Sequence, residues 1–212
     1  GVRTRYASAP RARAARPPLR LLDAPKFLLA PGATETSVVS GDLSLLSNPL
    51  DRAVLAQLSD VVQQATKAFE NYDYARALQI TESYFWHFTD DYVELIKDRA
   101  YGAAGGTEQA SVLAALATSL DTLLRLFAPF LPFATEEVWS WWRTGSVHRA
   151  QWPSAVEIDG DTTLLATVGT ALSGIRKAKS EAKVKQRTEV LSATITAPES
   201  LTTQLKAGLV DL

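Results

Sequence analysis

The stretch YFWHFTDDYVELIKDR, residues 84–99, holds the residue types that a metal site or an acid/base centre needs. If the segment is a regular helix of about 100° per residue, one of its faces carries an imidazole and three carboxylates: His87, Asp91, Glu94 and Asp98. Such groups, spaced by four, three and four residues, could bind a cation or transfer protons. The chemistry of this face is the first question that the sequence raises.

A stripe that contacts solvent or a partner is the alternative to a metal site on this face. A hard metal ion needs oxygen ligands that converge from several segments, whereas these four residues lie on one predicted helix. Charged residues along an exposed helix face are usually solvated. We therefore expect no metal here. A second stripe of the same helix is apolar and is predicted to enter the core: Phe85, Phe88, Tyr92, Leu95 and Ile96.

The composition favours a globular domain and excludes several kinds of site. Of the 212 residues, 46% are hydrophobic and 21% are charged, which is enough for a packed core. The lack of cysteine excludes disulfides, thiolate catalysis and cysteine-bound zinc. We find no uninterrupted apolar run of membrane-spanning length, no Gly-x-Ser-x-Gly elbow and no Gly-rich phosphate loop. Because the chain has no methionine, we expect it to be a piece of a longer protein.

The basic residues gather in two short zones of an otherwise acidic sequence. Residues 1–20 hold six arginines and no acid, and residues 176–187 hold six bases and one acid. Local positive charge on an acidic body suits a polyanion that touches part of the surface. Solvated segments are the alternative, and the first zone could also be an organelle transit peptide. The candidate RNA contacts in the second zone are Arg176, Lys177, Lys179 and Lys183.

Hydrophobic periodicity predicts a mainly α protein, an antiparallel helical bundle followed by a small, incomplete α/β module. Asn48 and Pro49 are typical of a helix start. Short connections favour antiparallel packing of the bundle helices, predicted over 49–70, 74–99, 107–127 and 132–142. The module is predicted as an α-β-α unit, with a helix over 162–183, a strand over 188–197 and a helix from Pro198. The predicted division of the chain is a basic N-terminal segment, the bundle and the module, over 1–18, 19–153 and 154–212.

Aromatic residues near Pro129 and Pro132 are predicted to pack a corner between two helices. The prolines force a bend, and aromatic side chains at such a bend usually belong to the core. The residues concerned are Phe127, Phe130, Phe133, Trp139 and Trp142.

Several motifs together resemble the anticodon-binding domain of class I aminoacyl-tRNA synthetases. They are NPLDRAVLAQL, YDYARALQITESYFWHFTDDYVELIKDR, LLRLFAPFLPFATEEVW and VHRAQWP, within residues 48–153. The pattern Phe-Trp-x-Phe-x-Asp-x-Tyr-x-Glu is similar to that of the valyl-type enzymes. RLLDAPKF resembles their Lys/Arg-Leu-x-Asn-Ala-x-Lys/Arg-Phe motif, from which Asp23 and Pro25 depart.

The resemblance implies that the bundle receives the anticodon stem-loop of tRNA(Val) between two helices. One helix carries RLLDAPKF and the other carries Asp-x-Tyr-x-Glu. On this resemblance Arg20 meets a phosphate or a base edge, Phe27 stacks on an unstacked base, and Val93 lines the apolar side. Asp23 and Asp90 complete the candidate tRNA-binding residues.

The resemblance also implies what surrounds this domain. The parent enzyme is expected to ligate valine to tRNA in the cytoplasm with ATP and Mg, through catalytic and editing domains that this chain lacks. The chain itself is expected to be a monomer without membrane contact, cofactor or catalytic residue. Two alternatives remain open. One is the same domain of an isoleucyl- or leucyl-tRNA synthetase, which the Trp-x-Phe-x-Asp-x-Tyr-x-Glu pattern disfavours. The other is a non-enzymatic helical scaffold or metal-binding regulator.

Overall fold

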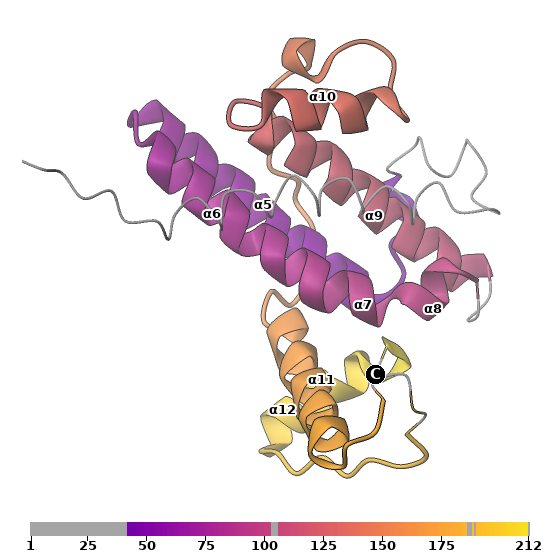
Figure 1. Ribbon diagram of the computed structural model, residues 1–212. Helices are drawn as coiled ribbons and strands as arrows, with labels where there is room; N and C mark the ends of the chain where they lie inside the picture. Colours follow the sequence, from indigo (N-terminus) through magenta and orange to yellow (C-terminus); the bar gives the residue numbers. More distant parts are fainter. Residues whose placement is uncertain (1–41, 103–105, 186–187, 189, 212) are drawn as a thin grey trace, which may run out of the picture.

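The computed structural model describes residues 42–102, 106–185, 188 and 190–211. These residues are mainly helical, which confirms the predicted fold class, and long helices form a bundle beside which a smaller helical pair, α11 and α12, packs (Figure 1). The elements in chain order are η1 (Leu43–Leu45), α5 (Pro49–Glu70), α6 (Tyr74–His87), the π-helix η2 (Phe88–Tyr92), α7 (Val93–Leu95), α8 (Lys97–Ala100), α9 (Gly106–Phe127), α10 (Pro132–Ser140), η3 (Val147–Arg149), α11 (Leu164–Glu181), α12 (Glu199–Ala207) and η4 (Leu209–Asp211).

The first long helix begins where the sequence predicted. The side chain of Asn48 accepts a hydrogen bond of 2.8 Å from the backbone N–H of Leu50, and Pro49 occupies the first helical position. The proline has no N–H to leave unpaired there, so cap and proline together define the start of α5. Asp73 caps α6 in the same way, accepting from the N–H of Arg76 at 3.0 Å.

The core is continuous from the bundle into α11 and α12. The predicted apolar stripe is confirmed, because none of its members is more than 7% exposed. Phe85 meets Phe127 of α9 edge to face, with 5.4 Å between ring centroids. Leu164 and Val168 of α11 belong to the same hydrophobic cluster. The division at residues 153 and 154 stays a prediction.

The prediction of one continuous helix over 74–99 is wrong at its centre. The α-helix ends at His87, a π-helix follows, and Ile96 leaves helical geometry with φ −85° and ψ 1°. A π turn takes in one more residue than an α turn. The successive residues Tyr92 and Val93 are both buried here, and the wider turn accommodates them. Apolar spacing of three and four residues does not reveal such a turn.

The predicted strand over 188–197 is also wrong. Residues 190–197 have no regular secondary structure, and residues 190–196 are all exposed. Residues such as Val190 and Ile195 favour strands, but a strand is stable only when a neighbouring strand supplies hydrogen-bond partners. No strand occurs in the part of the chain that the structure describes, so this segment has no strand to pair with there.

The aromatic corner forms, with one exception. Phe127 and Trp139 are 1% and 8% exposed, and Phe130 and Trp142 are half-buried. Phe133 is 90% exposed, so its predicted place in the core is wrong. The inner face of α10 is set by Thr135, Val138 and Trp139. Phe133 precedes Thr135 by two residues, about 200° around the helix, and therefore points away from the corner.

Helix α9 is apolar because it is the central helix of the bundle. Among the described residues it is the helix whose length and composition would allow it to cross a membrane, but 78% of its apolar window is buried inside the protein. A buried core helix of a soluble domain passes the same test, so this is weak evidence for a membrane span.

The segment that joins α10 to α11 crosses α5 at Gly160, where there is no room for a side chain. The Nε of Arg52 donates to the carbonyl of Asp159 at 2.8 Å, and the side chain of Gln57 donates to the carbonyl of Thr162. A Cβ at position 160 would lie 2.6 Å from the carbonyl oxygen of Arg52. The backbone of α5 would have to move to admit it.

We therefore expect Gly160→Ala to lower the free energy of unfolding by about 1–3 kcal/mol, the usual cost of overpacking. Denaturant titration followed by circular dichroism measures the change. Gly174→Ala is the matched control, because Gly174 lies within α11 and has no atom within 4 Å of a built Cβ. It should be neutral or stabilise by about 0.5–1 kcal/mol, since alanine favours helices. Equal effects at both positions would show that the close crossing does not matter.

Candidate nucleic-acid interface

The structure places two of the five candidate tRNA-binding residues. Asp90 lies in η2 and is exposed, whereas Val93 opens α7, is 7% exposed and belongs to the hydrophobic cluster. Val93 therefore offers little surface in this arrangement. Arg20, Asp23 and Phe27 lie outside the described residues. The roles of all five stay predictions.

The polar residues of the opening stretch form local pairs. His87 and Asp91 approach each other, with 3.5 Å between Nδ1 and Oδ2, while Glu94 pairs with Lys97. Asp91 lies within η2, and Glu94 lies just beyond it in α7. Within the described ranges, no three His, Asp or Glu side chains are arranged to hold a metal ion. The common face of the four residues and the absence of a metal stay predictions.

A buried polar cluster that was not predicted from the sequence lies behind this segment. Arg99 is 2% exposed, and its guanidinium donates to both carboxylate oxygens of Asp51 at 2.8 and 2.9 Å and to the carboxylate of Asp211. The hydroxyls of Tyr92 and Ser111 donate to Asp51 at 2.7 and 2.6 Å. These five residues, which we call the Arg99 cluster, join η2, α5, α8, α9 and η4.

Charge and burial act against each other in the Arg99 cluster. Burial alone would lower the pKa of Arg99, but the hydrogen bonds and charge of Asp51 and the charge of Asp211 raise it. Burial raises the pKa of the Asp211 carboxyl, although Arg99 opposes the shift. Burial, and next the charge of Asp51, raise the pKa of Tyr92 well above its usual value. The Tyr92 hydroxyl therefore keeps its proton and remains a donor.

The sequence did contain one signal for the Arg99 cluster. Arg99 follows Leu95 by four residues and Ile96 by three, so it continues the apolar stripe of its helix. An arginine in register with buried residues needs an anionic partner in the interior. Its partner Asp51 lies 48 residues earlier, and nothing local identifies it.

The second basic zone lies at the end of α11 and in the residues that follow. Lys177 is exposed and lies 3.9 Å from Glu181, while Lys183 is exposed in the left-handed region with φ 55°. Arg176 and Lys179 are half-buried.

The basic zone and η2 belong to neighbouring elements. Helix α11 packs against α5 and η2, and a Cβ built at Gly169 would lie 3.5 Å from the carboxyl carbon of Asp91. Lys177 follows Gly169 by eight residues, which is about 12 Å along the helix. The structure therefore brings the basic zone and η2, which lie far apart in the sequence, near to each other.

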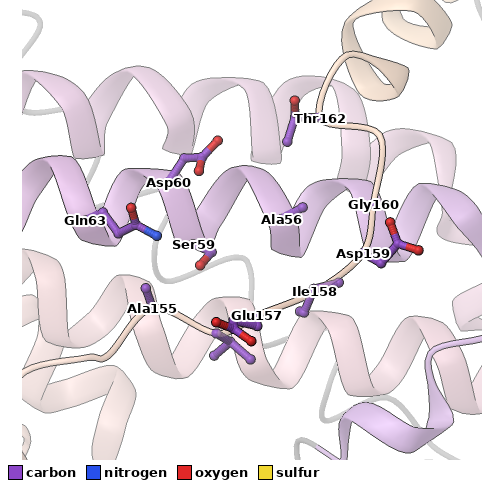
Figure 2. A pocket seen from close by; sticks show the side chains of 11 residues that line it. Ala56, Ser59, Asp60, Gln63, Ala155, Glu157, Ile158, Asp159, Gly160 and Thr162 are labelled. Atoms are coloured by element: carbon purple, nitrogen blue, oxygen red, sulfur yellow. The ribbon is translucent and has the colours of Figure 1, made fainter.

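A hollow of about 590 Å³ lies between α5 and residues 155–162 (Figure 2). Asp60 of α5 and Glu157 and Asp159 of the crossing segment belong to its lining. Three carboxylates repel phosphate, so this hollow does not suit a nucleic-acid backbone. The exposed parts of η2 and α11 are the better candidates for an RNA contact.

Comparison with known proteins agrees with the helical fold. Residues 51–195 match the family described as anticodon-binding domain of tRNA ligase. The chain is 46% identical to a valine--tRNA ligase of Cutibacterium acnes over 198 residues, covering 92% of this chain and 22% of that protein. It is 48% identical to that of Leifsonia xyli, with the same coverage, and 50% identical to that of Thermobifida fusca over 182 residues, covering 84% and 20%. The chain thus spans about a fifth of the length of the curated relatives it matches.

Proposed function

The chain belongs to the anticodon-binding domain family of tRNA ligases, and on this premise we propose that it binds the anticodon stem-loop of tRNA(Val). The proposal rests on the family match over residues 51–195, together with 46–50% identity to three valine--tRNA ligases. The isoleucyl and leucyl alternatives are disfavoured because these relatives are named for valine. Membership of a tRNA ligase family likewise disfavours a scaffold or a metal-binding regulator.

In this proposal the anticodon loop lies between the RLLDAPKF segment and η2. Phe27 stacks on an unpaired base, and Arg20 contacts a phosphate or a base edge. Asp23 and Asp90 accept hydrogen bonds from base amino groups. Val93 is 7% exposed, so in this proposal it supports the apolar side of the site from within the core.

The basic zone extends the proposed contact to the phosphates of the stem. Lys177 and Lys183 are exposed, and α11 packs against η2, which supports one RNA partner for both regions. Arg176 and Lys179 are the half-buried members of the same zone. Lysine binds phosphate as a point charge without sequence preference, so this part would add affinity rather than specificity.

We propose that the whole enzyme attaches valine to tRNA in the cytoplasm, with ATP and Mg²⁺ used in domains outside these 212 residues. In the described part of the chain, no set of carboxylates or histidines converges to hold Mg²⁺. The chain would therefore contribute tRNA recognition, and the catalytic and editing domains would contribute the chemistry. We further propose that it acts as a monomer and without membrane contact.

Titration with synthetic stem-loops tests the proposal. A stem-loop with a valine anticodon should bind more tightly than one of equal length with an unrelated anticodon. Phe27→Ala should weaken binding by roughly 1–3 kcal/mol with little change in salt dependence, because base stacking is uncharged. Equal affinity for both stem-loops would contradict anticodon recognition.

Basic residues require a separate readout, the dependence of log K on log salt. Lys177→Ala should lower this slope by about one unit if the lysine contacts a phosphate. Lys67→Ala is the control, because Lys67 is exposed in the last turn of α5, ten residues beyond Gln57, which holds the start of α11. It should leave the slope unchanged. If only Lys67 alters the slope, the RNA lies on the other end of the bundle.

A further inference from the structure

The π-helix η2 is held to the interior of the bundle by the buried rings of Phe88 and Tyr92 and by the hydroxyl group of Tyr92. Tyr92 is fully buried, and its hydroxyl donates to Asp51 of α5 at 2.7 Å. Thr89, the other hydroxyl-bearing residue in this turn, bonds to carbonyls of its own helix at Phe85 and Trp86. The hydrogen bond of Tyr92 therefore links η2 to a different helix.

The acceptor of this hydrogen bond, Asp51, also accepts hydrogen bonds from two other residues. Asp51 is fully buried in the first turn of α5, where Arg99 binds both of its oxygens and Ser111 donates to one of them. The oxygen of Ser111 in turn accepts from the backbone N–H of Asn48 at 3.2 Å. A carboxylate with this many partners has little freedom to follow a moving tyrosine, so it acts as a fixed point.

The residues proposed to meet RNA lie next to Tyr92 in the chain. Asp90 precedes it by two positions and Val93 follows it by one. A π turn has backbone hydrogen bonds between residues i and i+5 and is often found at functional sites. The side-chain contact of Tyr92 adds to these bonds a link to another helix.

We propose that Tyr92 is a positioning residue for RNA recognition, whose hydroxyl holds Asp90 and Val93 in place through the Arg99 cluster. The RNA part of this inference rests on the proposed function. The hydroxyl itself does not touch RNA, because it is buried against Asp51.

Two tyrosine variants separate positioning from general stability. Tyr92→Phe removes the hydroxyl and keeps the ring, which stacks on Phe88 at 5.5 Å. Tyr84→Phe is the matched control, because Tyr84 is 6% exposed and also stacks on Phe88, with 6.1 Å between ring centroids. Its hydroxyl donates to the carbonyl of Val54 at 3.0 Å. It lies in α6, outside the π-helix.

Amide hydrogen exchange of the free protein is the first measurement. Tyr92→Phe should accelerate exchange over residues 88–97 by about fivefold, the factor that one net hydrogen bond represents, and Tyr84→Phe should not. Equal acceleration in both variants, or none in either, would overturn the positioning role without any reference to RNA.

Binding of the valine-anticodon stem-loop is the second measurement. Tyr92→Phe should raise Kd by up to about fivefold, because the apparent Kd rises in inverse proportion to the population of the binding-competent position. The salt slope should stay as in the wild type, and Tyr84→Phe should bind like the wild type. An unchanged Kd despite faster exchange would overturn the link to RNA. Failure of the wild type itself to bind would instead overturn the proposed function, and with it that link.

Discussion

Arg99→Leu is expected to lower the free energy of unfolding by about 3–5 kcal/mol, the cost of removing one partner from a buried ion pair. Arg99 is 2% exposed and is the cation between two buried carboxylates, Asp51 and Asp211. Leucine fills part of the space but leaves both acids in the interior without their counter-charge. Thermal and denaturant unfolding of the variant at neutral pH measure the loss.

Arg125→Leu is the control for this substitution. Arg125 also pairs with an aspartate, Asp121, but both side chains remain partly exposed, at 23% and 17%. Water screens such a pair, so its removal should cost no more than about 1 kcal/mol. If the two arginine variants lose equal stability, the Arg99 cluster contributes no more than a surface pair.

Trp139→Ala should cost about 3–5 kcal/mol, because a large buried ring is lost from the corner of α9 and α10. Trp139 is 8% exposed and packs edge to face on Trp142, with 6.4 Å between ring centroids. Equilibrium denaturation of the variant gives the cost directly.

Phe133→Ala tests the same corner from its outer face. Phe133 belongs to the same helix but is 90% exposed, so its truncation should change stability by less than about 0.5 kcal/mol. A large loss for Phe133 together with a small one for Trp139 would mean that α10 is rotated relative to this structure.

Features that depend on neighbouring residues could be predicted from the sequence. The start of α5 follows from Asn48 and Pro49, which satisfy the first helical turn by themselves. The stripe from Phe85 to Ile96 was found because burial on one side of a helix repeats every three or four residues. The family resemblance rested on the same local patterns.

Features that depend on distant residues could not be predicted. The 188–197 segment has strand-forming residues, but its structure depends on whether another strand lies beside it. The register of Arg99 with the apolar stripe indicates that it is buried, but nothing local identifies Asp51 as its partner, and only packing brings the two together. The π-helix could not be predicted for a different reason. One additional residue in a turn does not change the pattern of apolar residues from which a helix is recognised.

The π-helix also gives this segment a particular response to changes in length. A π turn takes in one residue more than an α turn, so the helix on either side keeps its phase. A one-codon deletion of Thr89, Asp90 or Asp91 would therefore restore an α turn and leave Arg99 facing Asp51. The same deletion within the regular helix α6 would rotate all later residues by about 100° and turn Arg99 away from Asp51. Among descendants of this gene, one-residue deletions should persist more often in the π-helix than in α6.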